Sequence, residues 1–173
     1  MERISRDEIA NFHCPRFDEL PTVALYKEQV IIYIEEILGS INFAYNQKIL
    51  TPTMINNYVK QKVVNPPKDK KYTNKHIAYL IVVCVLKQIL TIQEICQLIN
   101  KQIEICKIED AYNLFCVELE NAMVSVFITR DFSKEIYDKT ASLETVVLKS
   151  TVMSFAHKMG IEHYLHQKKT IEI

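Results

Sequence analysis

A chain of 173 residues, 49% of them hydrophobic, is long enough to bury a core, which excludes an intrinsically disordered tail. It contains only two glycines, and this shortage argues against β-rich and parallel α/β folds, which use glycine at many tight turns. The formal net charge is zero, yet Lys48–Lys75 holds seven lysines and one acid, so a local charge of +6 is balanced elsewhere. Such a basic island can bind a polyanion even in a neutral protein.

The first predicted elements are two helices. A capping box at Ser5–Glu8 opens a short helix. Apolar residues recur at three- and four-residue steps from Thr22 to Leu38, which predicts an amphipathic helix that ends at Gly39. Ser40–Leu50 shows no period and is expected to be a loop.

Three further helices are predicted in the middle of the chain. Thr51–Pro52 begins a helix, because threonine can cap it and proline fits its first turn, and this helix must end before Asn65–Pro66. After a lysine-rich loop, Thr73 caps a helix that runs to Leu90 and is apolar nearly all round, so we expect it in the centre of the fold. A second capping box, Thr91–Glu94, opens the next helix.

Two long helices complete the chain. One carries apolar residues at alternating four- and three-residue steps from Ile108 to Val126, as packed helices do, and the other covers about Leu143–Lys158. Asp131–Thr140 is expected to connect them. Gly160 is expected to end the last helix.

The helix after Thr51 has two chemically different sides. At 100° per residue, four polar residues share one arc, and Met54, Ile55, Tyr58 and Val59 share the opposite side. The polar residues are Thr53, Asn56, Asn57 and Lys60. Asparagine, threonine and lysine are residue types that contact base edges in the major groove of DNA. A solvated surface helix would show the same pattern. The order of the neighbouring elements must therefore distinguish a DNA-reading helix from an ordinary surface helix.

The order of elements in residues 53–99 resembles the MerR-type winged helix. Met54–Ile55–Asn56–Asn57–Tyr58 resembles the family's recognition helix, and Lys62–Val63–Val64–Asn65–Pro66 its helix-ending Gly-Leu-Leu-Pro-Pro stretch. Tyr72–Thr73 is similar to the Tyr-Ser that closes the wing, and the segments Leu86–Gln88 and Thr91–Ile95 to its last two helices. Asn56–Asn57 stand where MerR proteins carry Arg-Tyr, so no arginine contact is implied. The turn between the last two helices is one residue shorter and lacks glycine.

A closer resemblance covers roughly residues 16–165. Three segments resemble a bacterial family of unknown function that is regarded as MerR-like and occurs mostly in Gram-positive bacteria: Leu25–Tyr26–Lys27–Glu28–Gln29–Val30, Leu50–Lys60, and Lys70–Lys71–Tyr72 with His76. The resemblance implies an all-α winged helix-turn-helix fold with additional long helices at both ends. On this basis we expect an N-terminal arm at 1–21, a DNA-binding domain at 22–104 and a helical dimerisation or effector region at 105–173. The last region either packs with the DNA-binding domain as one unit or forms a separate one.

From these features we expect a cytoplasmic, homodimeric DNA-binding regulator. Thr53, Asn56, Asn57 and Lys60 would contact bases of double-stranded DNA. The lysine-rich wing at Pro66–Tyr72 would contact the phosphate backbone through Lys68, Lys70 and Lys71, together with Lys75. Tyr58 would lie mainly in the core, with its hydroxyl near the rim, where it would donate to a phosphate. One short helix contacts only a half-site, which favours a homodimer.

Two alternatives stay open. A protein-interaction module could keep the winged-helix frame without DNA readout, since the arginine is missing. A small-molecule effector could occupy a pocket formed by apolar residues of the last two helices: Tyr112, Phe115, Phe127, Phe155 and Met159.

Several classes of function are not expected. The sequence has no P-loop, no dinucleotide-binding glycine motif, no GxSxG and no HExxH, so we expect no enzyme and no cofactor. Its five cysteines are odd in number and lack metal-ligand spacing, which predicts reduced thiols and no metal site. The longest apolar run, Ile77–Leu86, is too short to cross a membrane.

Overall fold

The computed structural model describes residues 6–42, 48–131 and 142–168. Its α-helices are α1 (Arg6–Ala10), α2 (Lys27–Leu38), α3 (Pro52–Lys60), α4 (Asn74–Leu86), α5 (Ile92–Ile105), α6 (Ile108–Val124) and α7 (Leu143–Lys168). The other elements are the 3₁₀ turns η1 (Phe17–Glu19) and η2 (Gly39–Ile41), the π-helical turn η3 (Ser125–Thr129), and the strands β1 (Leu25–Tyr26) and β2 (Lys71–Tyr72). The described part of the chain is therefore mostly helical, which confirms the all-α prediction.

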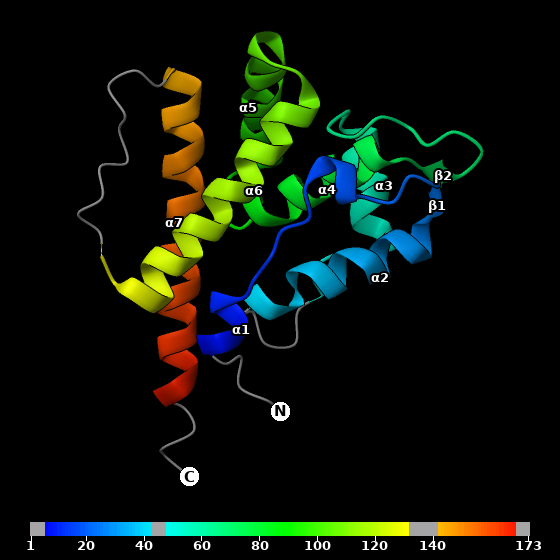
Figure 1. Ribbon diagram of the computed structural model, residues 1–173. Coiled ribbons are helices and arrows are strands. Elements are labelled where there is room, and N and C mark those ends of the chain that lie inside the picture. The colour runs from blue at the N-terminus through cyan, green and yellow to red at the C-terminus, as the bar shows by residue number, and fades with distance from the viewer. Residues whose placement is uncertain (1–5, 43–47, 132–141, 169–173) are drawn as a thin grey trace.

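Helix α4 is the centre of the fold, as its apolar sequence predicts. It contacts α2, α5, α6 and α7, and eight of its thirteen residues are buried. In Figure 1, α6 and α7 lie on one side of α4, whereas α2, α3 and the two strands lie on the other. The helix ends at Leu86 rather than Leu90, because the next residues form turns that lead to the Thr91 cap of α5.

The strand β1 was not expected from the sequence. Leu25 pairs with Tyr72 and Tyr26 with Lys71 in an antiparallel two-stranded sheet. Helix α2 therefore begins at Lys27 and not at Thr22. Its first turn is fixed by the Tyr26 amide, which donates to Oε1 of Gln29 at 2.9 Å.

Of the two glycines, Gly39 ends a helix as expected and Gly160 does not. Gly39 caps α2, but with a right-handed φ of −59°, and the chain continues into η2. Gly160 lies inside α7, so the expectation that it ends a helix was wrong. A Cβ on Gly160 would lie 3.0 Å from Cγ1 of Val126, which means that this glycine lets α7 approach η3 closely.

The N-terminal arm is held against α6 by a partly buried ion pair. The Arg16 guanidinium donates to both carboxylate oxygens of Glu120, at 2.8 and 2.7 Å. The backbone amide of Cys14 donates to the same carboxylate at 2.9 Å, and the Phe17 amide donates to Oδ1 of Asn113 at 2.8 Å. Burial opposes the ionisation of Glu120, but these hydrogen bonds outweigh it and lower the pKa of its carboxyl.

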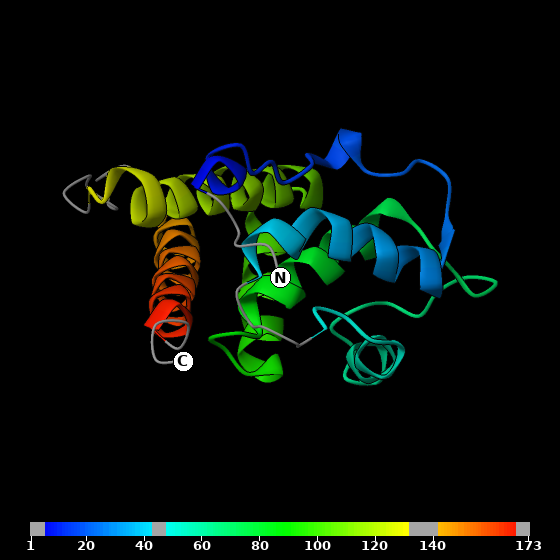
Figure 2. The same ribbon diagram turned by 90° about the horizontal axis from the view of Figure 1, so that it is seen from below.

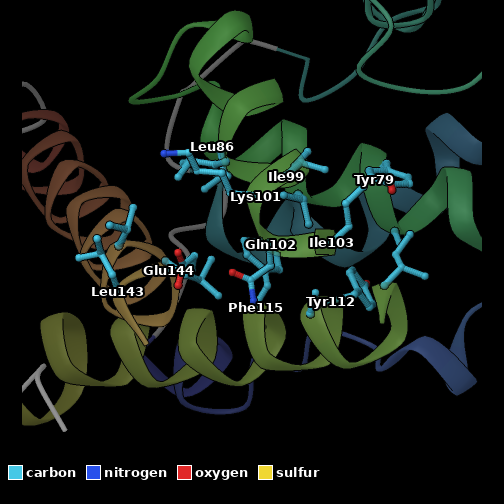
Figure 3. A pocket seen from close by; sticks show the side chains of 17 residues that line it. Tyr79, Leu86, Ile99, Lys101, Gln102, Ile103, Tyr112, Phe115, Leu143 and Glu144 are labelled. Atoms are coloured by element: carbon cyan, nitrogen blue, oxygen red, sulfur yellow. The ribbon is translucent and has the colours of Figure 1, made fainter. Parts of the chain in front are cut away.

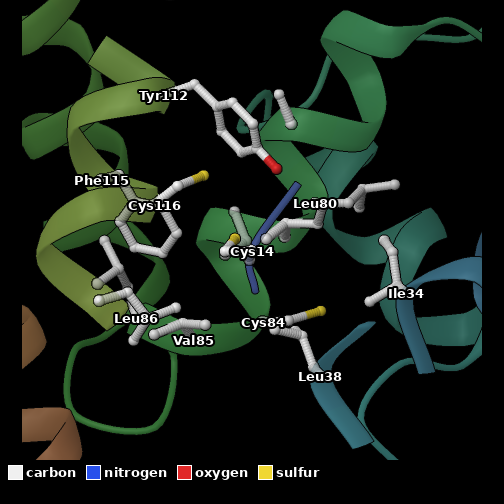
Figure 4. Packing of buried hydrophobic residues seen from close by; sticks show 14 of the residues in the cluster. Cys14, Ile34, Leu38, Leu80, Cys84, Val85, Leu86, Tyr112, Phe115 and Cys116 are labelled. Carbon is white, nitrogen blue, oxygen red and sulfur yellow. The ribbon is translucent and has the colours of Figure 1, made fainter. Parts of the chain in front are cut away.

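One hydrophobic core joins all three predicted segments of the chain. Figure 4 shows part of it: Ile34 and Leu38 from α2, Leu80 and Cys84 from α4, Phe115 and Cys116 from α6, and Cys14 from the arm. The core continues into α7 through Val152, Phe155, Ala156 and Met159. It therefore crosses both expected boundaries, at residues 21–22 and 104–105.

Helix α6 continues through η3 as one long apolar helical segment. Ile108–Thr129 is the one helix in the described ranges that is long and apolar enough to cross a membrane, a test that core helices of soluble proteins also pass. Its acids Glu118 and Glu120 form ion pairs with Lys149 and Arg16, respectively.

Three predictions fall on residues outside the described ranges. They are the Ser5 cap, residues 43–47 of the predicted loop and residues 132–140 of the predicted connector.

Candidate nucleic-acid interface

Helix α3 has the two faces that its sequence predicts. Thr51 caps it, since the Met54 amide donates to the threonine hydroxyl at 3.2 Å, and Pro52 occupies its first turn. Ile55 and Tyr58 are buried. The four predicted base-contacting residues, Thr53, Asn56, Asn57 and Lys60, are all exposed.

The end of α3 is a Schellman motif with lysine in the position that normally takes glycine. The Val63 amide donates to the Tyr58 carbonyl at 3.0 Å, and the Lys62 amide to the Val59 carbonyl at 3.0 Å. Lys62 has a φ of 61°, in the left-handed region that disfavours side chains with a Cβ. The motif turns the chain away from α3 and buries Val63 and Val64 in the core.

The lysine-rich loop forms a tight turn at Lys68–Lys71, which we call the lysine turn. Its two central residues, Asp69 and Lys70, have φ values of 50° and 62°, as in a type I′ turn. The Lys71 amide donates to the Lys68 carbonyl at 2.9 Å. The turn leads directly into β2, so the pairing with β1 fixes it relative to the start of α2.

The start of α2, the face of α3 and the lysine turn surround one hollow of about 430 Å³. Lys27, Asn56 and Lys70 line it, one from each of these segments. The Lys27 ammonium donates to Oδ1 of Asn56 at 2.7 Å. The Lys71 ammonium lies 5.2 Å from the centre of the Tyr26 ring, a cation–π contact that stabilises the two-stranded sheet. Figure 2 shows α3 end-on beside the loop that carries the turn.

Lys27 is a member of this site that the sequence did not reveal. It lies 21 residues before Lys48, the first lysine of the basic island, and the β1–β2 pairing together with the packing of α2 against α3 places it there. A two-residue strand leaves too short an alternating pattern to be recognised from sequence.

The remaining predicted site residues lie in different surroundings. Asn57 accepts a hydrogen bond from Gln61 at 3.0 Å. Tyr58 is only 3% exposed, and burial raises the pKa of its phenol, so it acts mainly as part of the core. Lys68 is exposed at the start of the lysine turn. The Lys75 ammonium lies 3.8 Å from a carboxylate oxygen of Glu109 on α6, and Lys75 borders a different hollow. The structure therefore does not bring Lys75 to the face of α3.

The charge around the hollow is mostly positive. Five lysines lie on the segments that surround it, together with two acids, Glu28 and Asp69. The lysines are Lys27, Lys60, Lys68, Lys70 and Lys71. Helix α3 itself carries no acid. The face therefore offers lysine ammonium groups and amide side chains, which can bind phosphates and base edges.

The expected effector pocket is only partly formed by the residues named for it. Tyr112 and Phe115 do line a cavity, together with residues of α4, α5 and α7. Phe155 and Met159 instead lie at a separate small hollow beside Leu38, and the Phe127 ring packs against His163. The prediction failed there because helical period alone does not tell which helices face each other.

The cysteines and metal ligands give no further site. All five cysteines are free, with Cys14, Cys84 and Cys116 buried. Burial raises the pKa of the Cys84 thiol to about 12, so it is an unreactive core residue. In the described ranges, no group of three His, Cys, Asp or Glu side chains is placed to hold a metal ion.

A comparison with protein families places the chain in one of them. The family described as "Domain of unknown function (DUF1836)" matches residues 15–115, more than half of the chain. The protein belongs to the DUF1836 family. The DUF1836 match runs from the N-terminal arm to the middle of α6, so it includes α3, the lysine turn and Lys27. Neither a curated protein nor a solved structure matches the chain.

Proposed function

We propose that this DUF1836 protein binds double-stranded DNA as a winged-helix transcription regulator of the MerR type. The observation that carries the proposal is the single hollow shared by Asn56 of α3, Lys70 of the lysine turn and Lys27 of α2. A recognition helix beside a basic wing is the arrangement in which a winged helix meets the major groove and the adjacent phosphates. The order β1, α2, α3, β2 and α4, with β1 paired to β2, supports such a frame.

In this proposal the two parts of the face have different tasks. Asn56, Asn57 and Thr53 read base edges, because an amide can donate and accept in one plane against adenine. Lys68, Lys70 and Lys71 neutralise phosphates and fix the position of α3 without reading sequence. Lys27 positions the Asn56 side chain through the hydrogen bond that its ammonium donates to Oδ1. An amide oxygen has two acceptor sites, so Oδ1 keeps one for a base edge while the Asn56 amide group donates.

The first test is the salt dependence of DNA affinity. A homodimer that engages three wing lysines per protomer contacts about six phosphates, so the logarithm of affinity should fall with the logarithm of salt at a slope of about −5. Lys70→Gln should reduce this slope by about two for the dimer. Lys107→Gln, an exposed lysine that begins α6, is the matched control and should leave the slope unchanged. Absence of duplex binding at low salt, or a flat response, overturns the proposal.

The second test is sequence readout. Duplexes are selected from a random pool at two salt concentrations, and the variants are then measured on selected and random DNA. Asn56→Ala and Asn57→Ala should lose about 1–3 kcal/mol on selected DNA and little on random DNA. Asn100→Ala makes the same chemical change on an exposed site of α5 and should alter neither affinity. Equal losses on both DNA pools for the α3 variants would refute the role of this helix in readout.

A protein-interaction module is the second candidate, and one observation favours it. Both α3 asparagines already accept a hydrogen bond within the protein, from Lys27 and from Gln61. A basic face with internally bonded amides suits an acidic protein partner. If the protein fails to bind duplex DNA at low salt but retains an acidic partner that Lys70→Gln releases, this second function replaces the first.

A further inference from the structure

The four helices α4, α5, α6 and α7 line a half-open cavity of about 210 Å³ on the side of α4 away from α3. Its walls are mostly apolar and come from all four helices, with Val82 of α4, Ile99 of α5, Phe115 of α6 and Val147 of α7 among them. Figure 3 shows the side chains that line the cavity, Ile99 and Phe115 among them. A concave, mostly apolar space between helices is the usual form of a small-molecule site.

Three charged or amide side chains interrupt this apolar wall: Lys101 and Gln102 of α5 and Glu144 of α7. In Figure 3 the Lys101 nitrogen lies at the edge of the lining residues. In Figure 3, Gln102 of α5 and Glu144 of α7 extend toward the middle of the lining residues. Glu144 takes part in none of the ion pairs between described residues, and the Gln102 amide makes only a 3.5 Å contact to the sulfur of Cys106. The carboxylate of Glu144 and the carbonyl oxygen of Gln102 are hydrogen-bond acceptors. A ligand that satisfies both must supply hydrogen-bond donors, and a protonated amine also neutralises the charge of Glu144.

We propose that this cavity binds a small apolar amine: one ring or short alkyl group with a protonated amino group directed at Glu144. The size of the ligand follows from the volume of the cavity. A cavity of about 150 Å³ holds benzene, so one of about 210 Å³ holds eight or nine heavy atoms. That is one ring with a short side chain, too small for a helix of a protein partner. The ammonium forms charge-assisted hydrogen bonds with Glu144, and the ring is buried among the apolar walls.

The site is independent of the proposed DNA face, although α4 connects the two. Ala78, Val82 and Leu86 of α4 line the cavity. Just beyond the end of the same helix, the Lys87 ammonium donates to the Ile49 carbonyl at 2.9 Å and lies 3.8 Å from the sulfur of Met54 in α3. Ligand binding is measured without DNA, so the result does not depend on whether the protein binds duplexes.

The experiment compares three probes of similar size on the full chain by ligand-observed NMR: phenethylamine, propylbenzene and phenylacetate. Phenethylamine should bind about five- to tenfold more tightly than the other two, as one charge-assisted hydrogen bond at a half-buried site predicts. Glu144→Gln should abolish this preference. Glu104→Gln, on an exposed position of α5 outside the cavity, should preserve it.

A second variant tests the location. Ala111→Leu on α6 fills part of the cavity and should remove the binding of phenethylamine, with folding checked by circular dichroism and thermal unfolding. If that variant does not fold, Val147→Phe on α7 makes the same test from the opposite wall. The proposal is overturned if no probe binds the wild-type protein, if the filled variant binds as well as the wild type, or if Glu144→Gln retains the amine preference.

Discussion

Replacing Lys62 by glycine should stabilise this protein, although it removes a charged side chain and adds no contact. Lys62 is the residue in the Schellman motif after α3, with a φ of 61°. A left-handed conformation costs an L-residue about 1–2 kcal/mol, and glycine escapes this cost. Glycine also loses more backbone freedom on folding, at about 0.5–1 kcal/mol. The expected net gain in the free energy of unfolding is therefore about 0.5–1 kcal/mol.

Urea unfolding at neutral pH measures this gain, and thermal unfolding should show a rise of about 1–4 °C for a chain of this length. Lys62→Ala is the matched control: it removes the same charge but keeps a Cβ in the left-handed region, so it should be no more stable than the wild type. The side chain of Lys62 is exposed, so its loss costs no buried contact. If Lys62→Gly is no more stable than Lys62→Ala, the conformational argument fails.

Three further predictions follow from the core and the caps. Gly160→Ala should change the free energy of unfolding little, because a gain of about 1 kcal/mol in helix propensity is offset by the 3.0 Å approach of the new Cβ to Val126. In a Val126→Ala background the same substitution should stabilise the protein by about 1 kcal/mol. Equal effects in both backgrounds would contradict this. Arg16→Met should lower the free energy of unfolding by about 1–3 kcal/mol at neutral pH. The difference in unfolding free energy between this variant and the wild type should shrink as pH falls below 4.5, because the Glu120 carboxyl, whose pKa is lowered in the fold, stabilises the protein only while it is ionised. A difference that stays constant through this acid range refutes the role of the ion pair. Burial lowers the pKa of His76, so the fold favours the neutral ring and should lose stability as pH falls below 6.5. His76→Gln keeps an acceptor for the Thr73 amide and should not show this loss in thermal unfolding. If the melting temperatures of variant and wild type fall in parallel with pH, the effect is excluded.

Local signals in the sequence were sufficient for several parts of the fold. The cap at Thr51 and the capping box at Thr91 and Glu94 are made by neighbouring residues, so short-range chemistry fixes where α3 and α5 begin. The two faces of α3 follow from helical period alone, and its exposed polar face was predicted residue by residue. The nearly uniform apolar composition of α4 identified the central helix.

Features that depend on distant partners were not predictable. Lys27 joins the face of α3 through tertiary contacts alone: α2 packs against α3, and β1 pairs with a strand more than forty residues away. Lys75 looks equivalent to the other lysines in sequence, but in the fold it lies beside Glu109. Gly160 looks like a helix end, because nothing nearby in the chain reveals that Val126 packs against it.

The continuous core has a practical consequence for dissecting this protein. The DUF1836 match ends at residue 115, inside α6 and before the residue that holds Arg16. A fragment cut at that point keeps the whole candidate DNA face but loses the core side chains Leu119, Met123, Val152, Phe155 and Met159. Each such side chain contributes roughly 1.5–3 kcal/mol when buried, comparable in sum to the stability of a typical domain. The family boundary is thus not a folding boundary, and the shortest fragment able to fold on its own should extend into α7.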